Sequence, residues 1–225
     1  MKKYNDKYYS IGRKIPPEFE NPIDNTLLDI CDKLIPFCQK WKITPNFITV
    51  FRTILGFFTL YYFNFSSDWF FSILGTISFY FFDCLDGHLA RATNQVSIIG
   101  DYLDHYSDIS FYMLLIFIMS NKSYSNKVAV LLIIFIFTYL SFIQLGLQQK
   151  VYKKIKKDIR QENGKIKEDY KIIILDEIDD ELLDSLNSIH NLSEHHIAWT
   201  KYFGTGTSFL VLITSIYYIQ THVLG

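Results

Sequence analysis

Aspartates at positions 83, 86, 104 and 108 lie within or beside stretches that are apolar enough to span a membrane. The segment before them reads "WFFSILGTISFYFF", and the segment after them reads "ISFYMLLIFIM". An ionised carboxylate inside a bilayer is costly, so intramembrane acids usually have a partner and mark a functional site. A fold for this chain must therefore supply these acids with positive charge.

Hydropathy predicts an all-α integral membrane protein. The hydrophobic fraction of 49% is not extreme, but it is concentrated in a few long runs. Runs of roughly 18 or more apolar residues are expected to span the bilayer, and four lie near 46–65, 68–86, 126–147 and 202–224. A fifth run, near 98–120, is apolar only in its second half. We therefore expect about five to six transmembrane helices within one membrane domain, residues 24–225.

Three regions outside these apolar runs are not expected to span the membrane. Residues 1–23 are expected to form a cytoplasmic N-terminal segment. Residues 24–40 place apolar side chains on one helical face, which predicts an amphipathic helix in the membrane interface, kinked at Pro36. Residues 148–200 are basic and then acidic, which predicts a charged cytoplasmic insertion whose simplest form is a solvated loop with a helix or two.

The distribution of lysine and arginine predicts the orientation. These residues collect in 1–14, at Lys40 and Lys42, and in "KVYKKIKKDIR" (150–160). Positive residues accumulate in cytoplasmic connections, so these segments and the connection after Asp86 are expected on the cytoplasmic side.

Helical periodicity brings the acids together. Two stripes each fall on one helical face: the first contains Asp83, Asp86, Gly87, Ala90 and Arg91, and the second contains Gly100, Asp104 and Asp108. With a rise of about 1.5 Å per residue, the acids of two antiparallel helices reach the same depth, in the cytoplasmic third of a ~30 Å core. We expect the four carboxylates to converge there.

Converging carboxylates favour a divalent cation. Oxygen-only ligands select Mg²⁺, Mn²⁺ or Ca²⁺ over zinc, and a two-metal site would hold a phosphate oxygen during an in-line displacement. Gly87 and Ala90 leave room for a ligand on the same face, and Arg91 suits a phosphate. Two other interpretations are an ion-paired helix pair without a ligand and an ion transporter, because intramembrane acids also mark ion pathways.

The spacing of these residues resembles a known signature. Asp83-x-x-Asp86-Gly87-x-x-Ala90-Arg91, eight residues, then Gly100-x-x-x-Asp104-x-x-x-Asp108 resembles that of the CDP-alcohol phosphatidyltransferase family, and "TPNFITVFR" (44–52) is similar to its first-span Pro-Asn segment. The resemblance covers residues 40–147. It implies six spans and a homodimer, whereas hydropathy predicts five spans and an interfacial helix.

The resemblance also implies an activity. A Mg²⁺- or Mn²⁺-dependent enzyme at the cytoplasmic face would move a phosphate-bearing group from a CDP-linked donor to an alcohol and release CMP. By position, Asp83, Asp86 and Asp104 would hold metal, and Asp108 would complete the metal site and act as general base. The residues around the CDP moiety would be Asn46, Asp83, Gly87, Ala90, Arg91 and Gly100. No nucleic-acid partner is expected.

Two branches of the family fit the substrate region. The segment "DGHLARATNQ", which contains His88, resembles the corresponding segment of phosphatidylinositol synthases. An arginine at the position of Arg52 is similar to the pattern of the branch that uses CDP-diacylglycerol. We expect Arg52 to contact a phosphate, with an aspartate pair as the alternative. "DYLDHYSD" and the interfacial helix instead resemble the choline and ethanolamine phosphotransferases, which use CDP-amino-alcohols and diacylglycerol. We favour CDP-diacylglycerol as donor and a small polar alcohol, inositol first, as acceptor.

Overall fold

The computed structural model describes residues 12–17, 19–66, 68–163 and 197–222. These residues form helices joined by loops, with no β-strand among them. The elements are α2 (Pro22–Lys40), α3 (Pro45–Phe65), α4 (Trp69–Ala92), α5 (Ile98–Asn121), α6 (Lys127–Asn163), α8 (Ile197–Thr200), the 3₁₀-helix η2 (Lys201–Phe203) and α9 (Thr205–Thr221). The predicted all-α class is confirmed.

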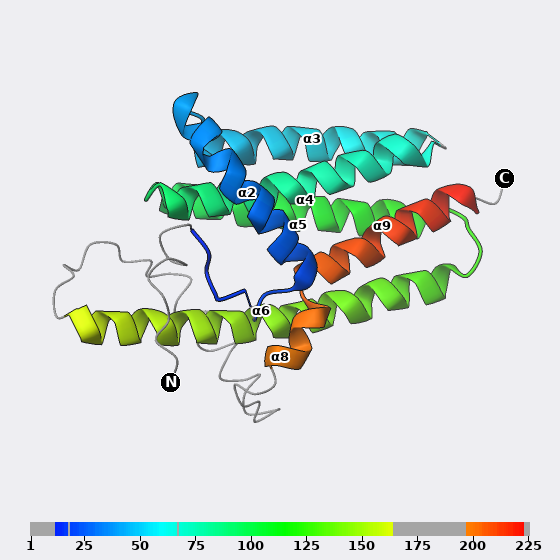
Figure 1. The fold of residues 1–225 in the computed structure, drawn as a ribbon. Coiled ribbons are helices and arrows are strands. Elements are labelled where there is room, and N and C mark those ends of the chain that lie inside the picture. Colours follow the sequence, from blue (N-terminus) through cyan, green and yellow to red (C-terminus); the bar gives the residue numbers. More distant parts are fainter. Residues whose placement is uncertain (1–11, 18, 67, 164–196, 223–225) are drawn as a thin grey trace.

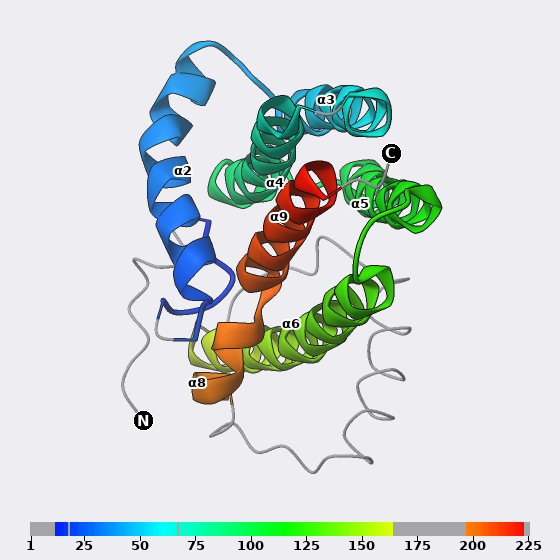
Figure 2. The same ribbon diagram turned by 90° about the vertical axis from the view of Figure 1, so that its right-hand side faces the viewer.

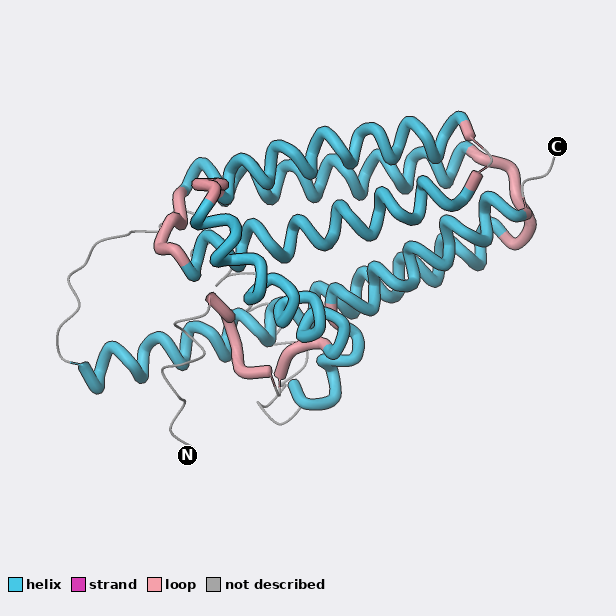
Figure 3. The backbone as a smooth tube through the Cα atoms, turned by 45° about the horizontal axis from the view of Figure 1, so that its top comes forward, coloured by secondary structure: helices cyan, strands magenta, loops and turns pink. Residues whose placement is uncertain are grey.

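Each of the five predicted apolar runs is a helix, and α3, α4 and α5 lie side by side (Figures 1 and 3). Four segments are long and apolar enough to cross a membrane: α3, α4, the first part of α6 (Lys127–Lys153), and Lys201–Thr221. The helix α5 is not among them, because its first half carries the acids, yet it packs against α3. The chain is thus an integral membrane protein.

The helix α6 does not end where its apolar run ends. It has 37 residues and continues through the basic segment to Asn163, a length of about 55 Å at the usual rise. Its far end projects beyond its neighbours at the end of the bundle where α3 begins (Figure 1). The first part of the predicted insertion 148–200 is therefore helical, while residues 164–196 lie outside the described residues. The division at residue 23 stays a prediction.

The predicted amphipathic helix is present as α2. It begins at Pro22, where the side chain of Asn21 accepts a hydrogen bond from the Ile23 amide (3.0 Å). Pro36 lies inside the helix, which continues to Lys40. The helix crosses α4 obliquely (Figure 1) and packs against α4 and α9. Phe37 remains more than half exposed, as expected for a helix with one face toward lipid.

The start of α2 is fixed by a buried carboxylate, Asp24. Its Oδ2 accepts hydrogen bonds from Thr205 Oγ1 (3.0 Å) and from the Gly206 amide (3.3 Å) at the start of α9. The Tyr80 hydroxyl of α4 donates to its Oδ1. An anion at a helix N-terminus is favourable because unpaired amides and the helix dipole meet there. Asp24 therefore joins three helices, and Figure 2 shows α2 running beside α4 and α9.

Small residues let the three central helices approach closely. A Cβ atom added at Gly75 of α4 would overlap the Thr59 hydroxyl of α3, and one added at Gly56 would lie 2.8 Å from the Phe79 ring. The Phe79 ring stacks on Phe111 of α5, with centroids 4.0 Å apart and planes inclined by 14°. These contacts hold the acid-bearing turns of α4 and α5 against the first turns of α3.

Candidate active site

The side chain of Arg52 is fully buried where α3, α4 and α5 meet. Its guanidinium forms ion pairs with the four aspartates that the two sequence stripes contain: Asp83 (Nη2–Oδ1, 3.0 Å), Asp86 (Nε–Oδ2, 3.1 Å), Asp108 (Nη1–Oδ1, 2.7 Å) and Asp104 (through Nη2). The structure thus brings all four carboxylates around one point. Arg52 pairs with aspartates, which is the alternative that the sequence left open beside a phosphate contact.

The charges in this cluster do not balance. Four ionised carboxylates and one guanidinium carry a net charge of −3 (four negative, one positive). Charges that are partly removed from water need compensation within their own surroundings. The cluster therefore has room for further positive charge, and one or two divalent cations would supply it.

Three of the aspartates are arranged as ligands for such a cation. One oxygen atom from each of Asp83, Asp104 and Asp108 lies within 4.8 Å of the other two. An all-oxygen donor set suits a hard divalent cation. Asp86 differs, because its side chain is only 4% exposed and its Oδ2 accepts hydrogen bonds from Thr49 Oγ1 (2.7 Å) and Arg52 Nε. The residues present fit a metal, with Asp86 the most buried of the four.

The inner side of the cluster is aromatic. The Cζ atom of Arg52 lies 4.9 Å from the centroid of the Phe79 ring, and Phe79 is stacked on Phe111. Beside them, the hydroxyls of Thr53 and Ser107 join α3 to α5 at 2.8 Å. Because the aromatic rings close the inner side, the partly exposed carboxylates are open toward the end of the bundle where α3 and α5 begin.

The other predicted site residues border the acids. A Cβ atom at Gly100 would lie 2.6 Å from Asn46 Oδ1, so the glycine lets the asparagine of α3 reach the first turn of α5. A Cβ atom at Gly87 would lie 3.2 Å from Arg91 Nη1, so the guanidinium folds over the glycine. Ala90, half-buried, follows on the same helical face. These five residues come from three helices at the same end of the bundle.

His88 lies on a different face from the acids. It is fully buried, and its Nε2 shares a hydrogen bond with Asp32 Oδ1 of α2 (2.6 Å). It follows Asp86 by two residues, which is about 200° around a helix. The side chain therefore faces α2, and the aspartates lie on the other side of α4.

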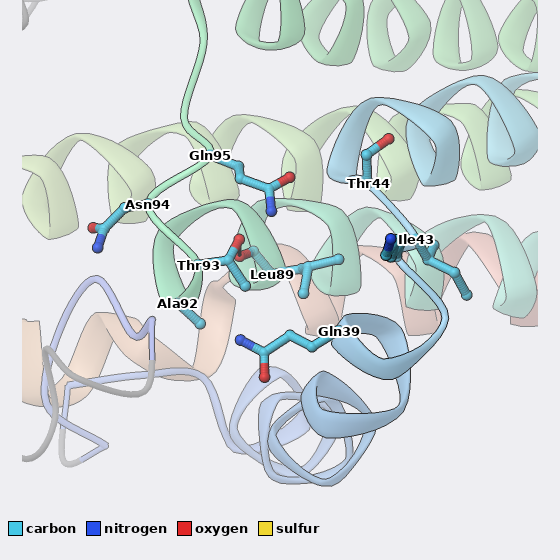
Figure 4. Close-up of a pocket in the computed structure, with 9 residues that line it drawn as sticks. Gln39, Ile43, Thr44, Leu89, Ala92, Thr93, Asn94 and Gln95 are labelled. Atoms are coloured by element: carbon cyan, nitrogen blue, oxygen red, sulfur yellow. Dashed lines mark hydrogen bonds between the residues drawn. The ribbon is translucent and has the colours of Figure 1, made fainter.

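A polar cleft of about 510 Å³ lies between the ends of α2 and α4 (Figure 4). Both helices end in a turn with a left-handed residue: Lys42 (φ 53°) follows α2, and Asn94 (φ 54°) follows α4. In the turn after α4, the Gln95 amide donates to the Ala90 carbonyl (2.8 Å), a common helix ending. None of the four aspartates lines the cleft, whose walls are Gln39, Lys42, Ile43, Thr44, Leu89, Ala92, Thr93, Asn94 and Gln95.

Sequence reasoning missed Thr49 and Phe79, which contact Asp86 and Arg52. A signal for the first was present, because Thr49, Arg52, Gly56 and Thr59 recur at i, i+3, i+7 and i+10 within an apolar run. Polar or small side chains on one face of a spanning helix indicate a packed or polar interface. Phe79 had no such signal among the many phenylalanines of its helix.

A comparison with protein families decides the assignment. The family model described as CDP-alcohol phosphatidyltransferase matches residues 42–175, more than half of the chain. The chain belongs to the CDP-alcohol phosphatidyltransferase family. The match includes α3, α4, α5 and the four aspartates. A search of curated proteins found no match.

Membership of the CDP-alcohol phosphatidyltransferase family supports a phosphatidyl transfer reaction of phospholipid synthesis, with a CDP-alcohol donor and an alcohol acceptor. The family generally depends on a divalent metal, which agrees with the three aspartates that lie close together here. The predicted family and transferase class are confirmed.

Replacing Arg52 with glutamine removes the cation that pairs with four carboxylates. We expect unfolding in EDTA to become easier by about 3–5 kcal/mol, the usual cost of breaking a buried ion pair. Added Mg²⁺ should recover part of the loss, because it supplies positive charge to the same carboxylates. Thermal unfolding of purified protein in detergent, with EDTA and with Mg²⁺, measures both effects.

The control is Arg91→Gln, since no carboxylate among the described residues lies within salt-bridge distance of Arg91. Its unfolding temperature should respond to Mg²⁺ as the wild type does. An equal response to Mg²⁺ in the two variants would contradict the role of Arg52 as the charge partner of the cluster.

Proposed function

We propose that this enzyme transfers a phosphatidyl group from CDP-diacylglycerol to a small polar alcohol, inositol first among candidates, and releases CMP. The observation that carries the proposal is the gathering of Asp83, Asp86, Asp104 and Asp108, at the spacing of the family signature, around one point. Family membership favours an enzyme over the ion-transport alternative.

In this proposal the aspartates hold Mg²⁺ or Mn²⁺. Asp83, Asp104 and Asp108 supply the three converging oxygens, and Asp86, fixed by Thr49, completes the set. A net charge of −3 leaves room for two divalent ions. When bound, these ions would stabilise negative charge on the phosphate oxygens of the donor.

Asp108 is our candidate for the general base. Its Oδ1 is fixed by Arg52 Nη1, and its Oδ2 has no hydrogen-bond donor among the described residues. It is also the most exposed of the four side chains, at 38%. Asp108 would take the proton of the acceptor hydroxyl as the alcohol oxygen bonds to the phosphatidyl phosphorus. The bond between that phosphorus and the CMP oxygen breaks, and CMP leaves with the electron pair.

The residues that border the acids would bind the CDP moiety. Gly87 and Gly100 leave space for phosphates close to the backbone. Arg91 would donate to phosphate oxygens in a bidentate manner, with Asn46 and Ala90 beside it. Asp83, about one helical turn before Gly87 on the same face of α4, would contact both metal and nucleotide.

The choice of substrates rests on the resemblance of "DGHLARATNQ" to phosphatidylinositol synthases and on the polar cleft. Asn94 and Gln95 of that segment line the cleft, whose amide and hydroxyl groups would receive a water-soluble polyol on its way to the aspartates, none of which borders the cleft. Arg52 gives no support, because the aspartates already pair with it. His88 gives none either, because it faces α2.

The donor assay tests this choice. Purified protein in detergent with Mg²⁺ or Mn²⁺ is offered each donor with its acceptor, and released CMP is measured. We expect CMP with CDP-diacylglycerol and inositol, and none in EDTA. CMP only with CDP-choline or CDP-ethanolamine plus diacylglycerol would assign the other branch. No CMP with any pair would refute the proposed function.

Conservative substitutions separate the roles of the aspartates. Asp108→Asn keeps the shape of the side chain but removes its basicity, so turnover should fall by roughly 10²–10⁴-fold while CDP still binds. Asp83→Asn removes a metal ligand, so Mg²⁺-dependent CDP binding should weaken as well. Calorimetric titration with CDP, with and without Mg²⁺, measures binding. Equal loss of binding in both variants would leave Asp108 without a separate role as base.

We propose that the site faces the cytoplasm. Lysine and arginine collect in the segments at this end of the bundle, including the continuation of α6, as the positive-inside rule requires. A single cysteine in a cysteine-free background reports the side by its reaction with an impermeant reagent outside intact cells. Position 123 should be labelled and position 94 should not, and labelling at 94 would reverse the orientation.

The homodimer implied by the family stays a prediction.

A further inference from the structure

Residues 12–17, named here the N-terminal strap, lead from the last turns of α4, where Gly12 lies, to α2, which Arg13 and Pro17 contact. Gly12 has φ +84°, a conformation that favours glycine. A Cβ atom at this position would lie 2.5 Å from the His88 carbonyl oxygen and 3.0 Å from the Ala92 amide nitrogen. A larger residue cannot take this place unless the strap moves away from α4.

The strap contacts Arg91 through its backbone. The Gly12 carbonyl accepts a hydrogen bond of 2.6 Å from Arg91 Nε. The Nη1 atom of the same guanidinium lies on the other side, over Gly87. Arg91 is thus held at its Nε by a neutral acceptor, and its charge is not cancelled there by a carboxylate.

The strap is itself anchored on α2, by the Asn25 amide and by the Asp29 carboxylate. Asn25 Oδ1 accepts from Arg13 Nη1 (2.7 Å), and Asn25 Nδ2 donates to the Pro17 carbonyl (2.9 Å). Arg13 also pairs with Asp29 (2.5 Å), and the Ile15 side chain is 2% exposed. Asn25 therefore holds both ends of the strap from α2.

A second cation of the strap acts on the aspartate cluster. Burial, the largest effect, and the charge of Arg91 lower the pKa of Lys14, whereas the nearby carboxylates of Asp104, Asp101 and Asp83 raise it. The contact of Gly12 with Arg91 places the strap beside the residues that border the acids.

We propose that the N-terminal strap is a positioning element that orients Arg91 toward the phosphates of the CDP-linked donor. The inference rests on the proposed function, which makes a nucleotide diphosphate the anion at this site. A long arginine side chain loses rotamer freedom when it binds a ligand, and a group that is fixed beforehand binds more tightly because this cost is already met. The Gly12 carbonyl provides that fixation, so the strap acts through Arg91 on donor binding.

Two substitutions release the strap by different routes. Gly12→Ala displaces it from α4, and Asn25→Ala removes the hydrogen bonds that join α2 to Arg13 and to the Pro17 carbonyl. Each should raise the donor KM and the Kd for CDP with Mg²⁺ by about tenfold, with kcat within about twofold, because binding and not chemistry is changed. The control is Thr26→Ala on the same helix, whose hydroxyl donates to the Pro22 carbonyl within α2. It should match the wild type.

A double-mutant cycle distinguishes positioning from mere stabilisation. The substitution Arg91→Lys removes the guanidinium that the strap orients, so Asn25→Ala should have no further effect on CDP binding in that background. Equal effects of Asn25→Ala in the wild-type and Arg91→Lys backgrounds, or an unchanged Kd for CDP in Asn25→Ala, would overturn the proposal. Wild-type protein that releases no CMP would refute the proposed function instead, and the CDP-binding cycle would still decide on the strap.

Discussion

One guanidinium buried among four carboxylates governs how the central helices can pack. Arg52 comes from α3, whereas its partners come from α4 and α5, so the ion pairs join three helices at a single depth. Like charges on neighbouring helices repel strongly where water is scarce. The acid-bearing turns can approach each other only because this cation lies between them.

Aromatic rings, small residues and neighbouring segments surround the cluster of Arg52 and the four aspartates. The stacked rings of Phe79 and Phe111 close it on the inner side, and the small side chains at Gly56 and Gly75 let α3 come close enough for Arg52 to reach across. At the end of the bundle where the carboxylates are open, the N-terminal strap packs against the last turns of α4, and α2 packs against the face of α4 opposite the acids. The cluster therefore has a rigid apolar base and a polar rim, which is how charged groups are held in place without losing access to a ligand.

Periodicity and hydropathy predicted the parts of the structure that depend on one helix at a time. The helices lie where the apolar runs are. The helical period of 3.6 residues also predicted which residues share a helical face with Asp83 and which with Asp104. Contacts between helices were harder to predict. Nothing in the sequence states whether Arg52 meets an aspartate or a phosphate, because that depends on distances across α3, α4 and α5. The extension of α6 also escaped hydropathy, since lysine and glutamine favour helix as well as leucine does. The Gly12 contact is made by a backbone carbonyl, which has no side-chain signature.

The anchoring of α2 has a consequence for biosynthesis. Asp24 accepts a hydrogen bond from Thr205, which is 181 residues further along the chain. At about 5–20 residues per second, a ribosome needs roughly 10–35 s to make that stretch. During this interval α2 can rest against α4, but the Asp24 carboxylate lacks two of its three partners. The packing of α2 against α4 and α9 is therefore completed only after α9 has been made, so α2 reaches its final set of hydrogen bonds well after its own synthesis.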